Sequence, residues 1–150
     1  MGSVRAFTVG IIHALSTLCN ETYSQIELAD YAIDLEQNIL KENVGSQDQI
    51  ACALGGMNHI KFGPGNSWNH IRLEISNEFQ IKLEERMVLV FTGLSRNSSE
   101  VSASLVENIS TKAKYLERIR ELTNSCRAII ENDKDLDEIG EMLDESWRIS

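Results

Sequence analysis

The chain has 150 residues, 42% of them hydrophobic, and a formal net charge of −9. This length and composition predict a globular protein with a core of ordinary size. The acidic balance speaks against nonspecific binding to nucleic acid and against binding to an anionic membrane surface. It leaves room for a local phosphate site, because backbone N–H groups can build one without basic side chains.

The three cysteines, Cys19, Cys52 and Cys126, lie far apart and form no C-x-x-C pair. An odd number of scattered cysteines indicates reduced thiols in a cytoplasmic protein, rather than a disulfide framework or a zinc site. No apolar stretch approaches the length of a membrane span.

Two helices are predicted in the first 40 residues. Residues 5–19 carry apolar side chains at helical spacing, and we expect this helix to be buried. Thr22 and Gln25 have the spacing of a capping box, which predicts the start of a second helix that runs to about Leu40.

Glu36 lies in the middle of the apolar arc of this second helix. A buried carboxylate is costly unless it is paired or binds a metal. The pattern alone leaves two readings equally open. Glu36 pairs with a basic residue or lies at an exposed helix end, or it has a functional role.

A short helix is predicted for residues 47–54, between Gly45-Ser46 and Gly55-Gly56. Ser46 and Gln49 again have capping-box spacing. Asp48 lies in the first turn, where the helix dipole favours an ionised carboxylate. It is either a plain helix-start residue or a catalytic base.

The second half of the chain combines strand and helix signals. Residues 57–76 predict a β-hairpin around the turn Gly63–Trp68, and the continuous apolar run Met87–Phe91 predicts a central strand. A long helix capped by Asn97 or Ser98 and a last helix anchored by Trp147 follow, which makes the class α+β.

Glu36, Asp48 and the Gly2-Ser3 pair at the start of the first helix are the parts of a phosphoryl-transfer site. They would supply a magnesium carboxylate, a base and an anion cradle of backbone N–H groups. By themselves they are a weak signal, because such residues occur in most proteins.

Three segments make this signal more specific: "SVRAFTVGIIHAL", "LEQNILKENVGSQDQIACALGGMNHIKF" and "MVLVFTGLSRNSSEV". In this order they resemble the GHMP family of small-molecule kinases, above all its branch that phosphorylates D-glycero-D-manno-heptose 7-phosphate. The resemblance implies the GHMP-kinase fold, with a ribosomal protein S5 domain 2-like part and a helical, ferredoxin-like C-terminal domain. Residues 1–95 would belong to the N-terminal, ATP-binding domain and residues 96–150 to the start of the C-terminal domain.

The resemblance also implies a role for each matching position. Asp48 corresponds to the catalytic base and Glu36 to the acidic Mg²⁺ ligand. Gly2 and Ser3 correspond to the end of the loop that wraps the ATP phosphates, and Ser3 would also contribute to the metal site. The residues expected to contact the sugar phosphate are Gly45, Gln47, Gln49 and Arg96.

Departures from the family pattern favour a second interpretation. Val4 and Arg5 follow Ser3 where the family usually has Ser or Ala, and Ser46 stands where a basic residue usually precedes Gln-Asp-Gln. The chain also resembles the middle of a kinase, without the first family motif and the late Gly-rich motif. The alternatives are an inactive remnant that acts as an interaction module, through self-association or a complementing chain, and a kinase for a galactose- or fucose-type sugar.

Overall fold

The computed structural model describes residues 3–91, 93, 109–132 and 135–149. These residues form two compact units, one that ends at Ile71 and one that starts at Arg72. In the described part, helices accompany a two-stranded sheet, which agrees with the predicted α+β class. The division into domains at residues 95 and 96 lies in a stretch that is not described, and it stays a prediction.

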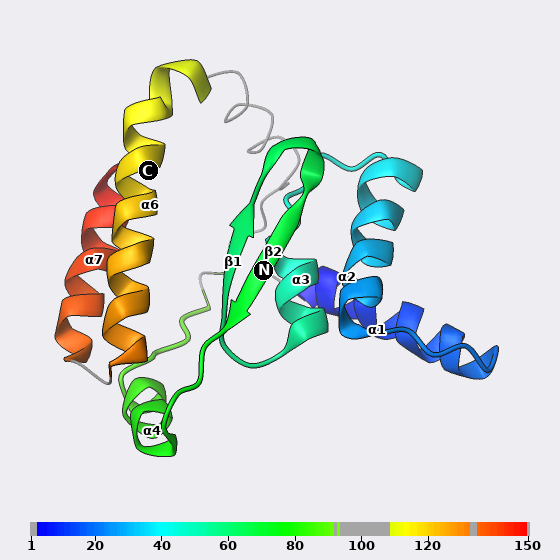
Figure 1. Cartoon of the computed structure of the whole chain (residues 1–150), viewed down its shortest axis with the longest axis horizontal. Helices are drawn as coiled ribbons and strands as arrows, with labels where there is room; N and C mark the ends of the chain where they lie inside the picture. The colour runs from blue at the N-terminus through cyan, green and yellow to red at the C-terminus, as the bar shows by residue number, and fades with distance from the viewer. Residues whose placement is uncertain (1–2, 92, 94–108, 133–134, 150) are drawn as a thin grey trace. The chain divides into compact units, whose positions relative to one another are not determined.

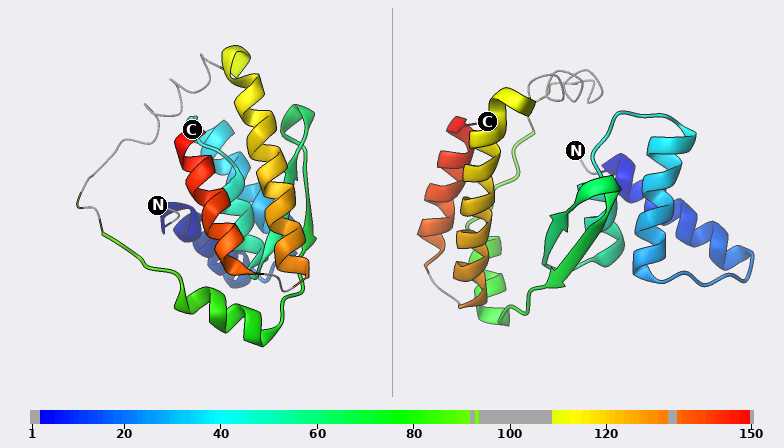
Figure 2. Two further views of the ribbon diagram at one scale, coloured as in Figure 1. Left: turned by 90° about the vertical axis from the view of Figure 1, so that its left-hand side faces the viewer. Right: turned by 45° about the horizontal axis from the view of Figure 1, so that its top comes forward.

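The first unit consists of helices followed by a β-hairpin (Figures 1 and 2). Its elements are α1 (Ser3–Leu18), α2 (Gln25–Asp34), the π-helical turn η1 (Leu35–Ile39), α3 (Gln47–Leu54), β1 (Asn58–Phe62), the 3-10 turn η2 (Pro64–Asn66) and β2 (Trp68–Arg72). Strands β1 and β2 pair with each other, so the predicted hairpin is confirmed. Its turn is tight because Gly65 and Asn66 both have positive φ angles, of 65° and 60°.

The core of this unit lies where α1, α2 and α3 meet. Its buried hydrophobic side chains are Val9, Leu28, Ala29, Ala32, Ile50, Ala53 and Leu54. Trp68 packs against this cluster, and its indole Nε1 donates to Asp30 Oδ1 at 2.8 Å. The hairpin is thereby attached to α2.

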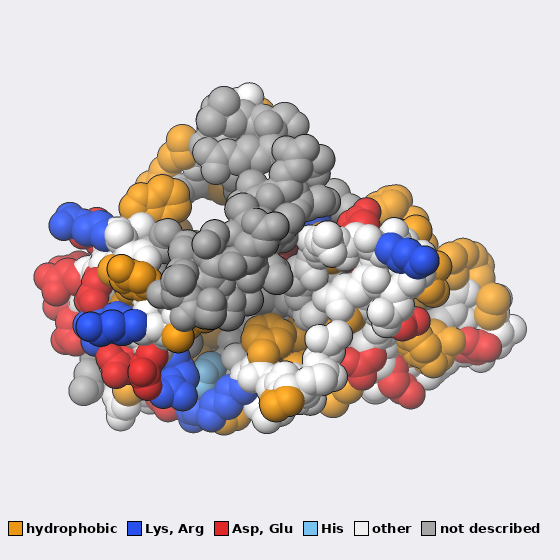
Figure 3. Space-filling model, turned by 90° about the horizontal axis from the view of Figure 1, so that it is seen from above, with side chains coloured by type: hydrophobic (Ala, Val, Ile, Leu, Met, Phe, Trp, Pro, Cys, Tyr) orange, Lys and Arg blue, Asp and Glu red, His pale blue; other side chains and the backbone are white. Residues whose placement is uncertain are grey.

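The apolar stripe of α1 faces solvent, whereas the sequence predicts that this helix is buried. The helix itself is confirmed, but Phe7, Ile11, Leu15 and Leu18 are 67%, 39%, 56% and 79% exposed. Exposed hydrophobic side chains are visible on the side of the molecule where α1 and α2 lie (Figure 3). The reason is that α1 turns a second face, with Val9 and Ser16, toward α2 and α3.

Both predicted capping boxes are wrong in detail. The box of α2 is formed by Ser24 and Glu27, whose side chains each bond the other's backbone N–H, and not by Thr22 and Gln25. At α3 Ser46 is the N-cap residue, but its side chain makes no capping bond; its Oγ accepts from Gln37 Nε2 at 3.0 Å.

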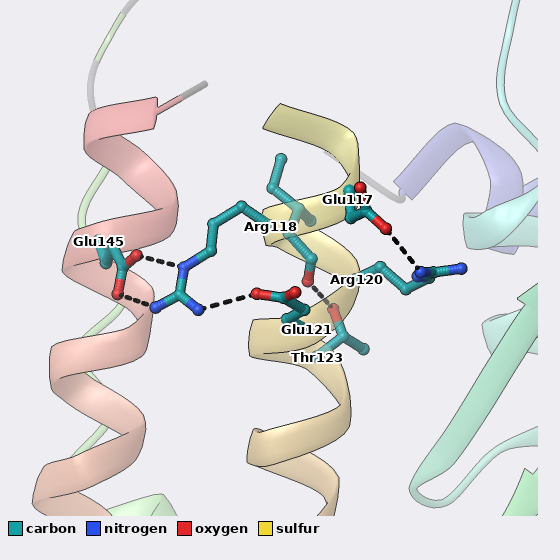
Figure 4. A network of polar contacts seen from close by, with 7 residues as sticks. Glu117, Arg118, Arg120, Glu121, Thr123 and Glu145 are labelled. Carbon is teal, nitrogen blue, oxygen red and sulfur yellow. Dashed lines mark hydrogen bonds and ion pairs between the residues drawn. The ribbon is translucent and has the colours of Figure 1, made fainter. Parts of the chain in front are cut away.

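The second unit contains the helices α4 (Asn77–Glu85), α6 (Ile109–Glu131) and α7 (Leu136–Ile149). Phe79, Ile129, Leu136 and Ile139 form its buried cluster. Arg118 on α6 binds both carboxylate oxygens of Glu145 on α7, at 2.7 and 3.0 Å (Figure 4). Helix α4 is not predicted above, although Ser76 caps it by accepting from the Phe79 backbone N–H.

The predicted central strand Met87–Phe91 is wrong. These five residues form no strand and are between 69% and 99% exposed. A central strand needs partners on both sides, and the only sheet among the described residues is the β1–β2 hairpin.

The end of the chain also departs from the prediction. Trp147, the expected anchor of the last helix, is 82% exposed, and the buried residues of this helix are Leu136 and Ile139. The predicted caps Asn97 and Ser98 lie outside the described residues. Within the described ranges, no helix is both long and apolar enough to cross a membrane.

Candidate functional site

Glu36 occupies the π-helical turn η1. The Leu40 N–H bonds the Leu35 carbonyl at 2.9 Å, five residues earlier, so one more residue than usual fits into this turn. Such single-turn π segments occur often at functional sites. Glu36 is only 2% exposed, so the carboxylate that stands out in the sequence is buried in the structure.

Three elements bring side chains to this carboxylate. Gln49 on α3 donates from Nε2 to Glu36 Oε2 at 2.7 Å. Arg5 on α1 places its Nε 3.6 Å from the same oxygen, with 16% of its side chain exposed. Glu36 thus has one charge-assisted hydrogen bond and one basic neighbour, which offset part of the cost of its burial.

Two oxygens of this cluster have no hydrogen-bond partner among the described residues. They are Glu36 Oε1 and Gln49 Oε1, both inaccessible to solvent. Unsatisfied acceptors of this kind are rare in native interiors and call for an explanation, such as an ion or a bound water.

Asp48 precedes Gln49 at the start of α3. Gln49 is fully buried, whereas Asp48 is exposed in the first turn of the helix. Burial raises the pKa of the Cys52 thiol, one turn later, and the negative charge of Asp48 raises it further. The sequence Asp48-Gln49 therefore presents one side chain to solvent and one to the buried carboxylate.

The loop before α3 is tied to η1. Gln37, next to Glu36, donates from Nε2 to the Val44 carbonyl at 2.9 Å and to Ser46 Oγ at 3.0 Å. Gly45 and Gln47, which flank Ser46 in this loop, are both exposed. The predicted sugar contacts that the structure describes therefore divide into two exposed positions, Gly45 and Gln47, and the buried Gln49.

The phosphate-loop residues are described only in part. The described part of helix α1 starts at Ser3, so the predicted helix N-terminus at Gly2 and Ser3 stays a prediction. Gly2, the Ser3 side chain and Arg96 lie outside the described residues, so their predicted roles are untested.

Arg5 and Gln37 are site residues that the sequence reasoning missed. The signal for Arg5 was present, since it stands where the family that the sequence resembles usually has Ser or Ala. The signal for Gln37 was its place directly after the anomalous Glu36.

The donor set agrees with a hard divalent cation. Carboxylate and amide oxygens suit Mg²⁺, which usually takes one or two protein carboxylates and keeps several waters. Glu36 Oε1 and Gln49 Oε1 are such oxygens, and both lack a partner in the described part. No group of three or more His, Cys, Asp or Glu side chains gathers there, so the protein would supply few ligands.

The second unit has a pocket of about 460 Å³ beside α4. It is lined by Ser76, Glu78, Phe79, Lys82, Arg86, Asp135 and Leu136. Lys82 pairs with Glu78, and Arg86 with Asp137, so these cations are already neutralised. None of the predicted site residues that the structure describes lines it.

Comparison with known proteins supports the sugar-kinase interpretation. Residues 1–56 match the family model of the GHMP kinases N terminal domain. The chain is 27% identical over 150 residues to a D-glycero-alpha-D-manno-heptose 7-phosphate kinase of Campylobacter jejuni, with 99% of the chain aligned. It is also 27% identical over 158 residues to a bifunctional fucokinase/GDP-fucose pyrophosphorylase of Arabidopsis thaliana.

The chain spans 44% of the length of the first relative and 14% of the second. No solved structure matches it. The resemblance to the GHMP kinases that the sequence motifs indicate is therefore confirmed, over residues 1–56 by the family model and over nearly the whole chain by two relatives that are named as sugar kinases.

Proposed function

We propose that this chain provides part of the active site of an ATP-dependent sugar kinase, which transfers the γ-phosphate of ATP to a sugar hydroxyl. The observation that carries the proposal is the buried Glu36–Gln49 pair, with one unpartnered oxygen on each residue, directly beside the exposed Asp48. Phosphoryl transfer depends on positioning and charge stabilisation, and these residues can supply both.

Asp48 is the proposed general base. It would accept or orient the proton of the attacking sugar hydroxyl, which requires an ionised and accessible carboxylate. Its exposure and its place in the first turn of α3 support this role.

Glu36 and Ser3 are the proposed Mg²⁺ ligands. When bound, Mg²⁺ would neutralise negative charge on the transferred phosphate. The N-terminus of α1, with the amides of Gly2 and Ser3, would hold the ATP phosphates, because the first N–H groups of a helix have no partner within it.

D-glycero-D-manno-heptose 7-phosphate is the proposed acceptor. The support is the Campylobacter jejuni relative and the resemblance of the sequence motifs that contain Gly45, Gln47, Gln49 and Arg96. The Arabidopsis thaliana relative supports a fucose-type sugar at the same identity, so L-fucose is the second candidate.

The alternative is an inactive interaction module. The exposed apolar side chains of α1 and the exposed run Met87–Phe91 favour it, since contiguous apolar surface often marks a protein–protein contact. Such a module would self-associate or bind a complementing chain, and it would not bind MgATP.

The test combines binding with turnover. We expect MgATP at millimolar concentration to raise the melting temperature, because a ligand that binds only the folded state stabilises it. ADP release is then measured with the heptose phosphate, L-fucose and galactose as acceptors. A melting temperature that MgATP leaves unchanged, together with no ADP release, would overturn the kinase proposal and favour the module.

A further inference from the structure

Arg5 is an unexpected neighbour of the buried carboxylate. Its Nε lies 3.6 Å from Glu36 Oε2, and the two side chains are 16% and 3% exposed. This separation is beyond the usual N–H···O range, so the contact is an ion pair rather than a hydrogen bond. The guanidinium is therefore near the carboxylate without being fixed to it by a bond of good geometry.

The two oxygens of Glu36 have different surroundings. Oε2 faces both Gln49 and Arg5, whereas Oε1 has no partner among the described residues. A cation bound through Oε1 would share this carboxylate with a guanidinium. Like charges at such short range repel strongly in a site with little solvent to screen them.

We propose that Arg5 is a positioning residue whose charge competes with a divalent cation for Glu36 and so weakens cation binding at this site. The inference rests on the proposed function, because it assumes that Glu36 binds the cation. Arg5 keeps the buried carboxylate compensated before the cation arrives. When the cation binds, the guanidinium loses its partner and moves away from Oε2.

The experiment measures Mn²⁺ binding by electron paramagnetic resonance, which detects the free ion and needs no turnover. Arg5→Met removes the charge and keeps a long apolar side chain, whereas Arg5→Lys keeps a charge. We expect Arg5→Met to bind Mn²⁺ at least about tenfold more tightly, the scale at which one adjacent charge shifts an ionisation. Arg5→Lys is expected to stay close to the wild type.

Arg148→Met is the matched control. It removes the same charge from α7, where Arg148 pairs with the exposed Asp144 at 2.8 Å. Its Mn²⁺ affinity is expected to equal that of the wild type. Equal tightening in Arg148→Met and Arg5→Met would attribute the effect to net charge and overturn the proposal.

Glu36→Gln tests separately whether Glu36 binds the cation and whether Arg5 weakens that binding. If it binds Mn²⁺ as the wild type does, Glu36 is not the ligand, and both the metal assignment and the role of Arg5 fall. If Glu36→Gln abolishes binding while Arg5→Met leaves the affinity unchanged, only the role of Arg5 falls.

The accessibility of Arg5 in the wild-type protein provides a second test, which does not require that Arg5→Met folds. Phenylglyoxal modifies accessible arginines, and peptide mass spectrometry locates the modified residue. Saturating Mn²⁺ is expected to increase modification of Arg5 and to leave that of Arg148 unchanged. Unchanged modification of Arg5 would overturn the proposal without any substitution.

Discussion

Gln49 Nε2 donates to Glu36 Oε2 at 2.7 Å, and this bond joins α3 to the π-helical turn η1. The two residues are 13 positions apart, and both are almost completely buried. The bond fixes the start of α3, and with it Asp48, relative to the carboxylate that we assign to the metal. It thus links the proposed base and the proposed metal ligand within one unit.

Gln49→Leu is expected to lower the free energy of unfolding by about 1.5–3 kcal/mol, the usual range for a hydrogen bond to a charged group. The substitution keeps a side chain of similar volume but removes the hydrogen bond to Glu36 Oε2. Among the described contacts of this oxygen, the ion pair with Arg5 then remains. Urea denaturation followed by circular dichroism measures the change.

Gln80→Leu is the control for Gln49→Leu. Its side chain donates to Glu84 Oε1 at 2.8 Å on the surface of α4, so the same substitution is expected to cost less than about 0.5 kcal/mol. Equal effects of the two substitutions would contradict the special role of the buried bond.

Asp48→Asn is expected to lower kcat by about 10²–10⁴-fold, the usual contribution of a general base. Because Asp48 is exposed, the melting temperature and MgATP binding are expected to change little. Steady-state kinetics with the acceptor that the wild type uses measures the loss.

Asp144→Asn makes the same chemical change at an exposed position of α7 and is expected to leave kcat unaltered. Normal turnover by Asp48→Asn would contradict the assignment of the base.

The sequence predicted most helices of the first unit, because their apolar spacing and the glycines after Leu54 are local signals. It also singled out Glu36, since a carboxylate on an apolar arc is unusual in any helix. Whether Glu36 was paired or functional stayed open, and Arg5 and Gln49 show that it has partners. Neither contact was predictable, because each joins segments that are distant in the sequence.

The wrongly predicted strand and capping boxes have a common cause: a sequence pattern shows which contacts a segment can make, but not which contacts it makes in the fold. Apolar content indicates that a segment can be buried, but not what will cover it. The run Met87–Phe91 has the composition of a central strand, yet nothing in the described part pairs with it. In the same way, Thr22 and Ser46 have capping-box spacing, but only a local fit of side chain to backbone decides which residue caps.

Ser24→Ala is expected to destabilise the protein by about 1 kcal/mol, the typical cost of losing an N-cap. Ser24 Oγ accepts from the Glu27 N–H at 3.2 Å, and Glu27 Oε2 accepts from the Ser24 N–H at 2.7 Å. These bonds also hold the pKa of Glu27 below its usual range. Thermal unfolding of the variant checks the prediction.

Thr22→Ala is the control for Ser24→Ala, because the sequence pattern predicts Thr22 as the N-cap of α2. Thr22 is exposed and is not the N-cap in the structure, so we expect a change of less than about 0.5 kcal/mol. A larger loss for Thr22→Ala than for Ser24→Ala would contradict the observed cap.

Arg118→Met is expected to make the second unit less stable at neutral pH, by an amount that shrinks and disappears as the pH falls. Hydrogen bonds from Arg118 lower the pKa of Glu145 below its ordinary value of 4.5. Since the folded pKa lies below the unfolded one, this pair contributes stability above about pH 4.5 and loses it as the pH falls through the folded pKa. Without Arg118 this contribution is absent at neutral pH, and the pKa of Glu145 returns toward its ordinary value.

Carbon-13 NMR of the Glu145 carboxyl group measures this pKa directly, and circular dichroism between pH 6 and 3 follows the helices. Arg148→Met, which removes a guanidinium from Asp144 on the same helix, is the control and is expected to leave the titration of Glu145 unchanged. High salt is expected to reduce the difference between wild type and Arg118→Met, because the pair is exposed and therefore screened. An identical Glu145 titration in the wild type and in Arg118→Met would show that the bidentate contact between α6 and α7 does not persist in solution.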